Sequence, residues 1–453
     1  MHAILSRSIC AAACVVLTSG FPVIVSGATF RVAEELKIDS VPSWFPVGFC
    51  LLTHGDQQYV AYYNAQHDLI VARRSLSERH WQKAVLPTKI GWDSHNYVTM
   101  AVDSAGDLHL SGNMHCVPLI YFRTRVPGDI TSFERLPMTG QEEERCTYPR
   151  FLRDADGQLL FMYRSGSSGK GRRFVNAYDP QSKTWTRFLD TALFEGEGLR
   201  NAYPQGPMQG PDGMFHLVWV WRETPDCATN HHLCYARSRD LKHWQNAAGQ
   251  SVALPFMLQC SEVWVDPIPE GGGIINGCES LAFDAKNRPT IAYHKRDDAG
   301  NMQIYVTRFE DGAWRRHSLT NWDQPIPFGG GGAMPFIGIG ISNLTPLEPD
   351  LFYLNYRHRD YGSGRIVLDQ TSLKPVDRAV TIPTEYPHEI GRTTIDFPGI
   401  HAKSAADLGG SADADTRYVL CWETLEANHD RPRQPPLPPA SALRLVELQR
   451  VVE

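Results

Sequence analysis

Residues 210–224, GPDGMFHLVWVWRET, indicate the fold class. In this stretch a turn rich in Gly, Pro and Asp leads directly into an apolar, aromatic-rich strand. Alternating, aromatic-rich runs that follow such turn formers are typical of β-strands. The same turn-and-strand unit recurs at residues 53–65, 103–115, 153–166, 284–296, 347–359 and 413–424. The chain therefore carries seven copies of one unit, and helical periodicity is nearly absent.

The spacing of the seven units predicts an all-β, seven-bladed β-propeller. Successive turns lie about 50–75 residues apart, a period that suits four short strands plus loops in each blade. Later segments at residues 75–81, 178–185, 238–244 and 310–314 look like degenerate Asp-box turns, in which an aromatic side chain packs between blades. Ordinary hairpins of a β-sandwich would have no reason to repeat seven times.

The two ends of the repeat region indicate how the ring closes. Residues 28–38 precede the first unit and residues 441–448 follow the last, and both segments are strand-like. One of them is expected to complete a shared blade, which removes the exposed edge that an open ring would leave. Residues 431–439 are Pro-rich and form a linker to the closing strand. The prediction is a single domain over residues 28–453.

The first 27 residues are expected to be a signal peptide. Arg7 supplies the positive charge, residues 9–25 are apolar and small, and residues 26–28 offer a small-residue cleavage site. A membrane anchor is disfavoured because Ser, Gly and Pro interrupt the apolar run. Cys14 leaves a lipoprotein anchor as a minor alternative. The expected location is extracellular or periplasmic.

Charge and cysteine usage limit the partners. The formal net charge is −6, so an acidic ligand must be held by local Arg and His residues, and no basic stripe predicts nucleic-acid binding. Ten cysteines are present, two of them in the leader, and the remaining eight show no CxxC pair. Some of these could form disulfides in an oxidising compartment, but the sequence leaves their connectivity open.

Polar residues recur at matching positions of the repeat. Seven or nine residues after the turns stand Asn113, His115, Arg164, Arg222, His294 and Arg296. Nine to eleven residues before the turns stand His95, Tyr97, Tyr148, Tyr203 and Cys278. Residues of equal strand parity share one face. These side chains are therefore expected to converge on one rim of the central channel.

Four of these residues form a candidate catalytic group: His95, His115, Tyr148 and Arg164. Each taken alone is more often structural, but their equivalent positions favour a joint role. No GxSxG or HExxH motif and no paired catalytic carboxylates accompany them. Two imidazoles, a phenol and a guanidinium suit β-elimination of a uronate, in which the carboxylate is neutralised, the C5 proton is removed and O4 is protonated.

At this constellation the sequence resembles the ulvan lyases built on seven-bladed propellers, within the wider group of BNR-like repeat proteins. The stretches that carry the resemblance run across nearly the whole mature chain: GWDSHNYVTM (91–100), GNMH (112–115), TYPRF (147–151), MYRSG (162–166), NAYPQGP (201–207), WVWRETPD (219–226), TNHHLCYARSRD (229–240) and CWETL (421–425). The resemblance implies cleavage of ulvan, a sulfated rhamnose–uronate polymer. It also implies that His95 and Tyr148 share base and acid duties while His115 and Arg164 neutralise the uronate.

Further residues are expected to contact sugar hydroxyls or sulfates: Asn96, Asn201, Tyr203, Arg222 and His231. For Arg222 and Tyr203, bracing of loops is an equally good interpretation. The expected partner is an acidic sulfated polysaccharide bound by a monomer, and no membrane is involved.

Relatives of this kind can carry a structural metal. Cys227, His231 and Cys234 crowd one hairpin, with Cys278 near the next unit, and their thiolate and imidazole donors would suit zinc. Their spacing matches no standard site, so a buried thiol beside solvated histidines is the preferred interpretation. A calcium site made of loop carboxylates also stays open. The chemistry itself requires no cofactor.

Two other functions compete with the lyase. A non-catalytic carbohydrate-binding propeller would keep the Arg and aromatic residues but needs no proton relay. A sialidase-like hydrolase would need an Arg triad and a Tyr–Glu pair, and the sequence offers no clear pair. The sequence leaves three points open. These are the preference for glucuronate or iduronate, endo or exo action, and which of His95 and Tyr148 is the base and which the acid.

Overall fold

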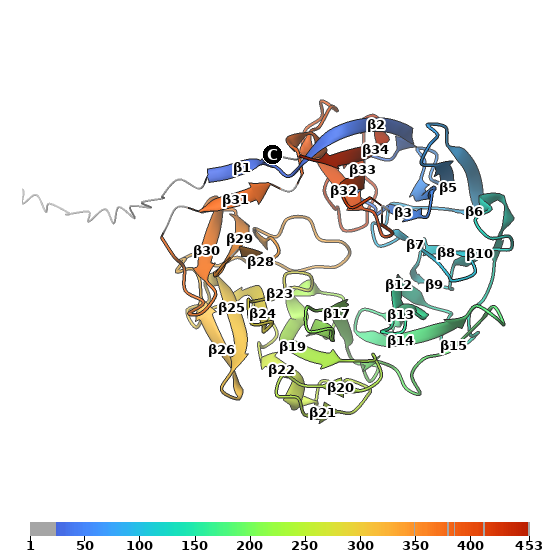
Figure 1. The fold of residues 1–453 in the computed structure, drawn as a ribbon. Coiled ribbons are helices and arrows are strands. Elements are labelled where there is room, and N and C mark those ends of the chain that lie inside the picture. Colours follow the sequence, from blue (N-terminus) through green and yellow to red (C-terminus); the bar gives the residue numbers. More distant parts are fainter. Residues whose placement is uncertain (1–23, 348, 378–379, 385, 411–412, 452–453) are drawn as a thin grey trace, which may run out of the picture.

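The computed structural model describes residues 24–347, 349–377, 380–384, 386–410 and 413–451. Within these ranges the strands form seven antiparallel sheets of four strands or more, set around a central axis (Figure 1). One further sheet pairs only two strands, β1 (Ile24–Ala28) and β31 (Thr381–Thr384), in parallel. The all-β, seven-bladed propeller expected from the repeat is confirmed.

The first three blades follow the chain from the blue to the green part of Figure 1. The first comprises β3 (Cys50–His54), β4 (Gln57–Tyr63), β5 (Asp68–Ser75) and β6 (Gln82–Lys89). The second comprises β7 (Val98–Val102), β8 (Leu108–Gly112), β10 (Tyr121–Thr124) and β11 (Phe133–Arg135). The third comprises β12 (Cys146–Arg153), β13 (Leu159–Ser167), β14 (Lys170–Asp179) and β15 (Thr184–Arg187), extended by β9 (His115–Val117) and β16 (Phe194–Glu195).

The remaining blades complete the ring. The fourth comprises β17 (Asn201–Gln209), β18 (Phe215–Arg222), β19 (Asn230–Ser238), β20 (Trp244–Gln245), β21 (Ser251–Val252) and β22 (Trp264–Asp266). The fifth comprises β23 (Ser280–Phe283), β24 (Pro289–Arg296), β25 (Met302–Glu310) and β26 (Ala313–Ser318). The sixth comprises β27 (Ile339–Ile341), β28 (Thr345–Leu347), β29 (Leu351–His358) and β30 (Gly362–Asp369). The seventh comprises β32 (His401–Ala406), β33 (Thr416–Thr424), β34 (Ser441–Arg450) and β2 (Phe30–Val41).

Helical structure in the described residues is confined to short 3-10 turns: η1 (Ile130–Ser132), η2 (Cys227–Thr229), η3 (Ser261–Val263) and η4 (His388–Gly391). No helix in these ranges has the length and apolar character needed to cross a bilayer. The predicted leader lies outside the described residues except for its last part, which belongs to β1. Export therefore stays a prediction.

In several blades the same hydrogen-bond pattern stabilises the turn between the first two strands. In the second blade, the Asp103 carboxylate accepts the backbone N–H groups of Ala105 and Asp107 at 2.8 and 3.0 Å, and Gly106 supplies the positive φ of 86°. Asp154 and Asp284 bond in the same way to residues two and four positions later. Asp side chains that mimic a backbone turn fix the hairpin between the first two strands of a blade. The turn residues of the repeat thus set the register of the strands.

Aromatic side chains fill the space between blades. Trp81, Trp185 and Trp244, which end three of the later segments, are 7%, 6% and 2% exposed. In the fourth blade, the Asp240 carboxylate accepts the N–H groups of Lys242 and His243 just before Trp244. This is the arrangement expected of an Asp-box turn, with the indole buried in the core.

The last blade joins the two ends of the ring. Strand β2 pairs with β34 from Phe30 opposite Arg450 to Val41 opposite Ser441. β2 is the outermost strand of a sheet whose other three strands come from the C-terminal part of the chain (Figure 1). The shared closing blade expected from the sequence is confirmed, and both candidate segments lie in it.

Candidate functional site

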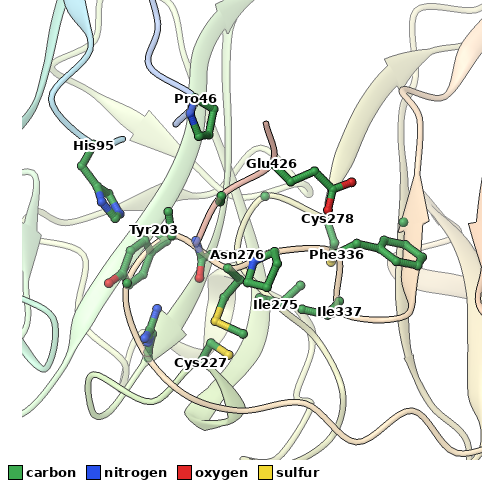
Figure 2. Close-up of a pocket in the computed structure, with 18 of the residues that line it drawn as sticks. Pro46, His95, Tyr203, Cys227, Ile275, Asn276, Cys278, Phe336, Ile337 and Glu426 are labelled. Atoms are coloured by element: carbon green, nitrogen blue, oxygen red, sulfur yellow. The ribbon is translucent and has the colours of Figure 1, made fainter. Parts of the chain in front are cut away.

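One cavity of about 690 Å³ lies where the repeat was expected to gather polar side chains. Seven of the eleven residues at the matching repeat positions line it: His95, His115, Tyr148, Tyr203, Arg222, Cys278 and His294. In each blade the start of the innermost strand lies beside the end of the second strand, because the two are antiparallel neighbours. Figure 2 shows His95 and Tyr203 on one side of the cavity and Cys278 on the other. The predicted convergence is confirmed for these seven residues, whereas Tyr97, Asn113, Arg164 and Arg296 do not line this cavity.

His95 and His115 form one hydrogen-bonded unit with two carboxylates. Their imidazole rings stack with centroids 4.3 Å apart. Nδ1 of His115 and Nδ1 of His95 both contact Asp93, the latter at 2.9 Å. Nδ1 of His95 also lies 3.0 Å from Asp430 Oδ2. Because both Nδ1 atoms are engaged by carboxylates, the Nε2 atoms are left for a ligand in the cavity.

The two carboxylates set the protonation of His95. Burial lowers the pKa of His95, but hydrogen bonds and charge interactions with Asp430 and Asp93 outweigh this and raise the pKa to about 9. Burial raises the pKa of Asp93, and hydrogen bonds from His115 and His95 more than reverse that, leaving it well below its usual range. At neutral pH, His95 is therefore an imidazolium beside ionised Asp93.

Tyr148 projects into the cavity from an irregularity in β12. The register of β12 against β13 shifts between Thr147 and Arg150, and Tyr148 has a φ of 58°. A non-glycine residue in this left-handed region costs roughly 1–2 kcal/mol. Such strain persists where the surroundings impose it, commonly at functional sites. The bulge directs the Tyr148 ring towards His95, with ring centroids 5.8 Å apart.

Two guanidinium groups lie against the Tyr148 ring. Cζ of Arg164 is 4.9 Å and Cζ of Arg173 is 5.7 Å from the ring centroid. Burial and the charge of Tyr203 raise the pKa of Tyr148, while Arg164 and Arg173 oppose part of that rise. Burial and Arg164 lower the pKa of Arg173 to about 10. Tyr148 is therefore a neutral phenol whose ionised form would be stabilised by two cations.

Arg164 does not lie on the cavity wall. Its side chain is fully buried behind Tyr148, and Nη2 donates to Thr147 Oγ1 at 2.9 Å and to Cys116 Sγ at 3.2 Å. The structure therefore brings Arg164 into the predicted group, but with Tyr148 between its guanidinium and the cavity.

The predicted substrate-contacting residues fall into two sets. Tyr203 and Arg222 line the cavity, with Arg222 Cζ 5.5 Å from the Tyr203 ring. Arg222 also donates to the carbonyl groups of Thr224 and Pro225, so it braces the following loop at the same time.

The other three predicted contacts are not on the cavity wall: Asn96, Asn201 and His231. The Asn96 carbonyl accepts the Tyr63 hydroxyl at 2.6 Å, and Asn201 is 2% exposed within β17. The buried His231 ring lies 2.8 Å from Glu223 through Nε2. These residues support the loops and strands around the cavity instead of facing it.

The expected zinc set is not brought together. Cys227 and Cys278 line the cavity, but His231 is held by Glu223, and Cys234 is buried in an apolar cluster with Trp219 and other core residues. Burial raises the pKa of the Cys278 thiol to about 11, which keeps it protonated. The thiols of Cys227 and Cys234 are buried, as the preferred interpretation had it, but His231 is buried against Glu223 and is not a solvated histidine. All eight cysteines of the described residues are free.

Among the described residues, one group of donors is compact: Asp93, His95, His115 and Asp430 lie with donor atoms within 4.8 Å of one another. Hydrogen bonds between the imidazoles and the carboxylates account for this spacing, so we describe the group as a His–Asp network.

Sequence reasoning missed Asp93, Asp430 and Arg173. Asp93 stands two residues before His95, a signal that was present in the sequence. Arg173 lies directly opposite Arg164 on the next strand, which a hairpin register would have indicated. Asp430 is remote in sequence and joins the site through Ser94 and His95.

A glycine-rich loop closes one side of the cavity. Residues 332–337, between β26 and β27, line the cavity, and Phe336 and Ile337 are seen at its edge in Figure 2. Ala333 N–H donates to Asp430 Oδ2 at 2.7 Å, and Gly330 N–H donates to Asp226 Oδ1 at 2.7 Å. Asp430 thus holds both this loop and the His95 imidazole.

Several known proteins are similar in sequence. The "Ulvan lyase, short isoform" of Alteromonas sp. (strain LOR) is 26% identical over 139 residues, which are 28% of this chain and 26% of that protein. The "Ulvan lyase, long isoform" of Glaciecola sp. (strain KUL10) is 34% identical over 79 residues, 16% of this chain and 8% of that protein. The chain therefore spans 26% or less of the length of these two relatives.

Two solved structures share the fold over nearly the whole chain. Polysaccharide lyase Uly1 superposes with a TM-score of 0.60 at 14% identity, covering 93% of this chain and 99% of that chain. An ulvan lyase of a new polysaccharide lyase family, bound to a glucuronate–sulfated rhamnose unit, superposes with a TM-score of 0.55 at 14% identity, covering 86% of this chain and 93% of that chain.

The family model described as "BNR repeat-containing family member" matches residues 57–322, more than half of the chain. This range begins in the first blade and ends after the fifth, so it contains the turns and inner strands that build most of the cavity. The chain therefore belongs to the BNR repeat-containing family.

Proposed function

We propose that this protein is a polysaccharide lyase that cleaves ulvan by β-elimination beside a uronate. The observation that carries the proposal is the meeting of His95, His115 and Tyr148 on one cavity wall, with two buried guanidinium groups behind the phenol. The relatives named as ulvan lyases and the shared propeller fold support the same chemistry. An exported enzyme and an acidic sulfated polymer as partner belong to this proposal.

His115 is the base in this mechanism. Its Nδ1 is held by Asp93, so Nε2 is directed away from the carboxylate and is available to accept the C5 proton of the uronate. Asp93 then stabilises the imidazolium that forms, as a carboxylate does for a histidine base. The electrons of the C5–H bond form the C4–C5 double bond.

His95 and Tyr148 complete the reaction. The His95 imidazolium faces the uronate carboxylate and neutralises it, which makes the C5 proton more acidic. As the C4–O4 bond breaks, the Tyr148 hydroxyl gives its proton to O4. The phenolate left behind lies against Arg164 and Arg173 until solvent restores its proton.

This assignment differs from the one that the resemblance implied. His115 is now the base, and His95 is now the group that neutralises the uronate. His95 is held cationic by two carboxylates and so lacks the free lone pair of a base, whereas His115 contacts a single carboxylate among the described residues. Arg164 is separated from the cavity by Tyr148, so it acts on the phenol and not on the uronate.

An absorbance assay with ulvan tests the function. β-Elimination yields an unsaturated uronyl end that absorbs in the ultraviolet, and we expect this signal to grow with time. New reducing ends without the absorbance would mean hydrolysis, and binding with neither signal would mean a carbohydrate-recognition propeller. Either result would overturn the lyase proposal.

Asp430→Asn is expected to move the alkaline limb of the pH profile of kcat/KM to lower pH. Asp430 raises the pKa of His95 to about 9, so removing its charge lets that pKa fall, and the cation is lost at lower pH. Asn keeps an acceptor oxygen for the Ser94 N–H and hydroxyl, but its amide nitrogen cannot accept the Ala333 N–H, so the bond to Ala333 is lost. A limb that stays in place would contradict the role of Asp430.

The same substitution has a consequence for stability. The folded pKa of His95 exceeds the unfolded value of 6.5, so its contribution is fully present below about pH 6.5 and is lost as pH rises through about 9. The wild type should therefore lose more stability than Asp430→Asn between pH 6.5 and 9, as measured by denaturant titration.

Arg222→Gln is expected to raise KM for ulvan by roughly tenfold or more, the usual loss for a hydrogen bond to a charged group. KM for chemically desulfated polymer should change little if Arg222 binds a sulfate. Equal losses for both polymers would show that Arg222 only braces the loop through Thr224 and Pro225.

A further inference from the structure

A second cavity, of about 280 Å³, lies behind the first. Tyr148, Tyr203, Asn276 and Gly277 line both cavities, so the two tyrosines stand between them. Their ring centroids are 6.1 Å apart with the planes at 69°. The two rings pack edge to face and form part of the wall between the first cavity and this second, inner cavity.

The wall of the inner cavity carries unusual positive charge. Arg150 and Arg173 line it, and Arg164 lies directly opposite Arg173 in the β13–β14 ladder. Like charges directly opposite on neighbouring strands destabilise a sheet. Arg164 is fully buried and Arg173 is 5% exposed, so water screens their repulsion poorly.

Neither cross-strand arginine is compensated by an acid within the described residues. Nε and Nη1 of Arg164 and Nε of Arg173 have no hydrogen-bond partner in the described part of the chain. Among the residues that the structure describes, Arg150 donates to the backbone carbonyls of Gly206 and Pro207 alone. Arg164 and Arg150 thus contact neutral groups, and no ion pair within the described ranges balances the charge of any of the three arginines.

The one carboxyl group on the wall does not offset these charges. Glu279 accepts the Gly277 N–H at 3.0 Å through Oε2, and its Oε1 has no partner. Burial raises its pKa well above the usual range, which favours its protonated, neutral form. The remaining titratable groups of the wall, Tyr97, Tyr148 and Tyr203, are phenols.

We propose that the inner cavity is a binding site for a small inorganic anion, held by Arg173 and Arg150 beside the ring of Tyr148. Buried guanidinium groups are stable in proteins when they are paired, and a bound anion supplies the missing partner. Halides and sulfate share this chemistry. An anion here would also disfavour ionisation of Tyr148 between catalytic cycles, a consequence that rests on the proposed function.

Diffraction from crystals of the whole chain tests the site directly. Crystals soaked in bromide are expected to show an anomalous peak in the inner cavity within contact distance of Arg173, and crystals grown in sulfate without halide distinguish the oxyanion. Density for neither anion in that cavity would overturn the proposal. No polysaccharide is used, so this outcome is independent of lyase activity.

Thermal unfolding gives a second test in solution. Replacing gluconate by chloride at constant ionic strength is expected to raise the Tm of the wild type by about 2 °C or more, since a ligand that binds the folded state stabilises it. Arg173→Gln should lose this response. The matched control is Arg125→Gln, which removes an exposed arginine paired with Glu134 and should keep it.

An equal chloride response in Arg173→Gln and the wild type would contradict the site, and so would no response in the wild type. If Arg173→Gln does not fold, the comparison of chloride with gluconate on the wild type and the bromide peak still decide the question.

Discussion

Tyr148→Phe should lower kcat for ulvan by about 10²–10⁴-fold, the range that a general acid contributes. The substitution keeps the aromatic ring against Arg164 and Arg173, so packing and the cation–π contacts are preserved. Only the proton donor for the departing O4 is lost. The measurement is the initial rate of ultraviolet absorbance under saturating substrate.

A substrate with a different leaving group at O4 tests whether Tyr148 is a general acid or a structural residue. A uronate with a nitrophenyl group at O4 needs no proton to depart, so Tyr148→Phe should cleave it at nearly the wild-type rate. Tyr203→Phe is the matched control, because its ring also lines the cavity and its hydroxyl already contacts Ser168. Equal damage by Tyr148→Phe on both substrates would exclude the acid role.

His115→Ala should reduce kcat by a similar 10²–10⁴-fold, because it removes the base. The truncation leaves space beside Asp93, so imidazole added to the solution should restore part of the rate. His243→Ala is the control, since that ring is 88% exposed and pairs with Asp240 in an outer turn. Its rate should be unaffected.

His95→Gln distinguishes the role of His95 from that of His115. Imidazole should not restore its rate, because His95 contributes a fixed charge and not a proton acceptor. Rescue of His95→Gln but not of His115→Ala would reverse the two assignments.

The ring and the rim of the cavity were predictable because they depend on periodic features. Turn residues such as Asp103 and Gly106 recur at fixed offsets from the strands they join, and each offset places polar side chains at the same end of a blade. His95, Tyr148 and Tyr203 could thus be placed on one rim without coordinates.

The details of the site depend on contacts that no local pattern encodes. Ser94 donates a hydrogen bond to Asp430, which lies 336 positions later in the sequence. The two residues meet because the closing of the ring brings the last blade beside the first. Strand parity predicted that Arg164 would reach the cavity, but the bulge at Tyr148 inserts the phenol in front of it. The exchange of roles between His95 and His115 likewise follows from which imidazole receives a second carboxylate.

The candidate zinc ligands show the same limit of sequence reasoning. His231 and Cys234 are close in sequence, which suggested a shared metal, yet they lie three positions apart on β19 and have different surroundings. Sequence distance is a poor guide to distance between side chains in β-structure.

The pairing of β2 with β34 has a consequence for biosynthesis. Glu35 in β2 meets Arg444 in β34, 409 residues later. At about 5–20 residues per second, the ribosome needs roughly 20–80 s to make that interval. During this time β2 is an unpaired edge, which is prone to aggregate. A chaperone that shields the nascent N-terminal strand would therefore be expected to raise the yield of folded protein more than one that acts after release.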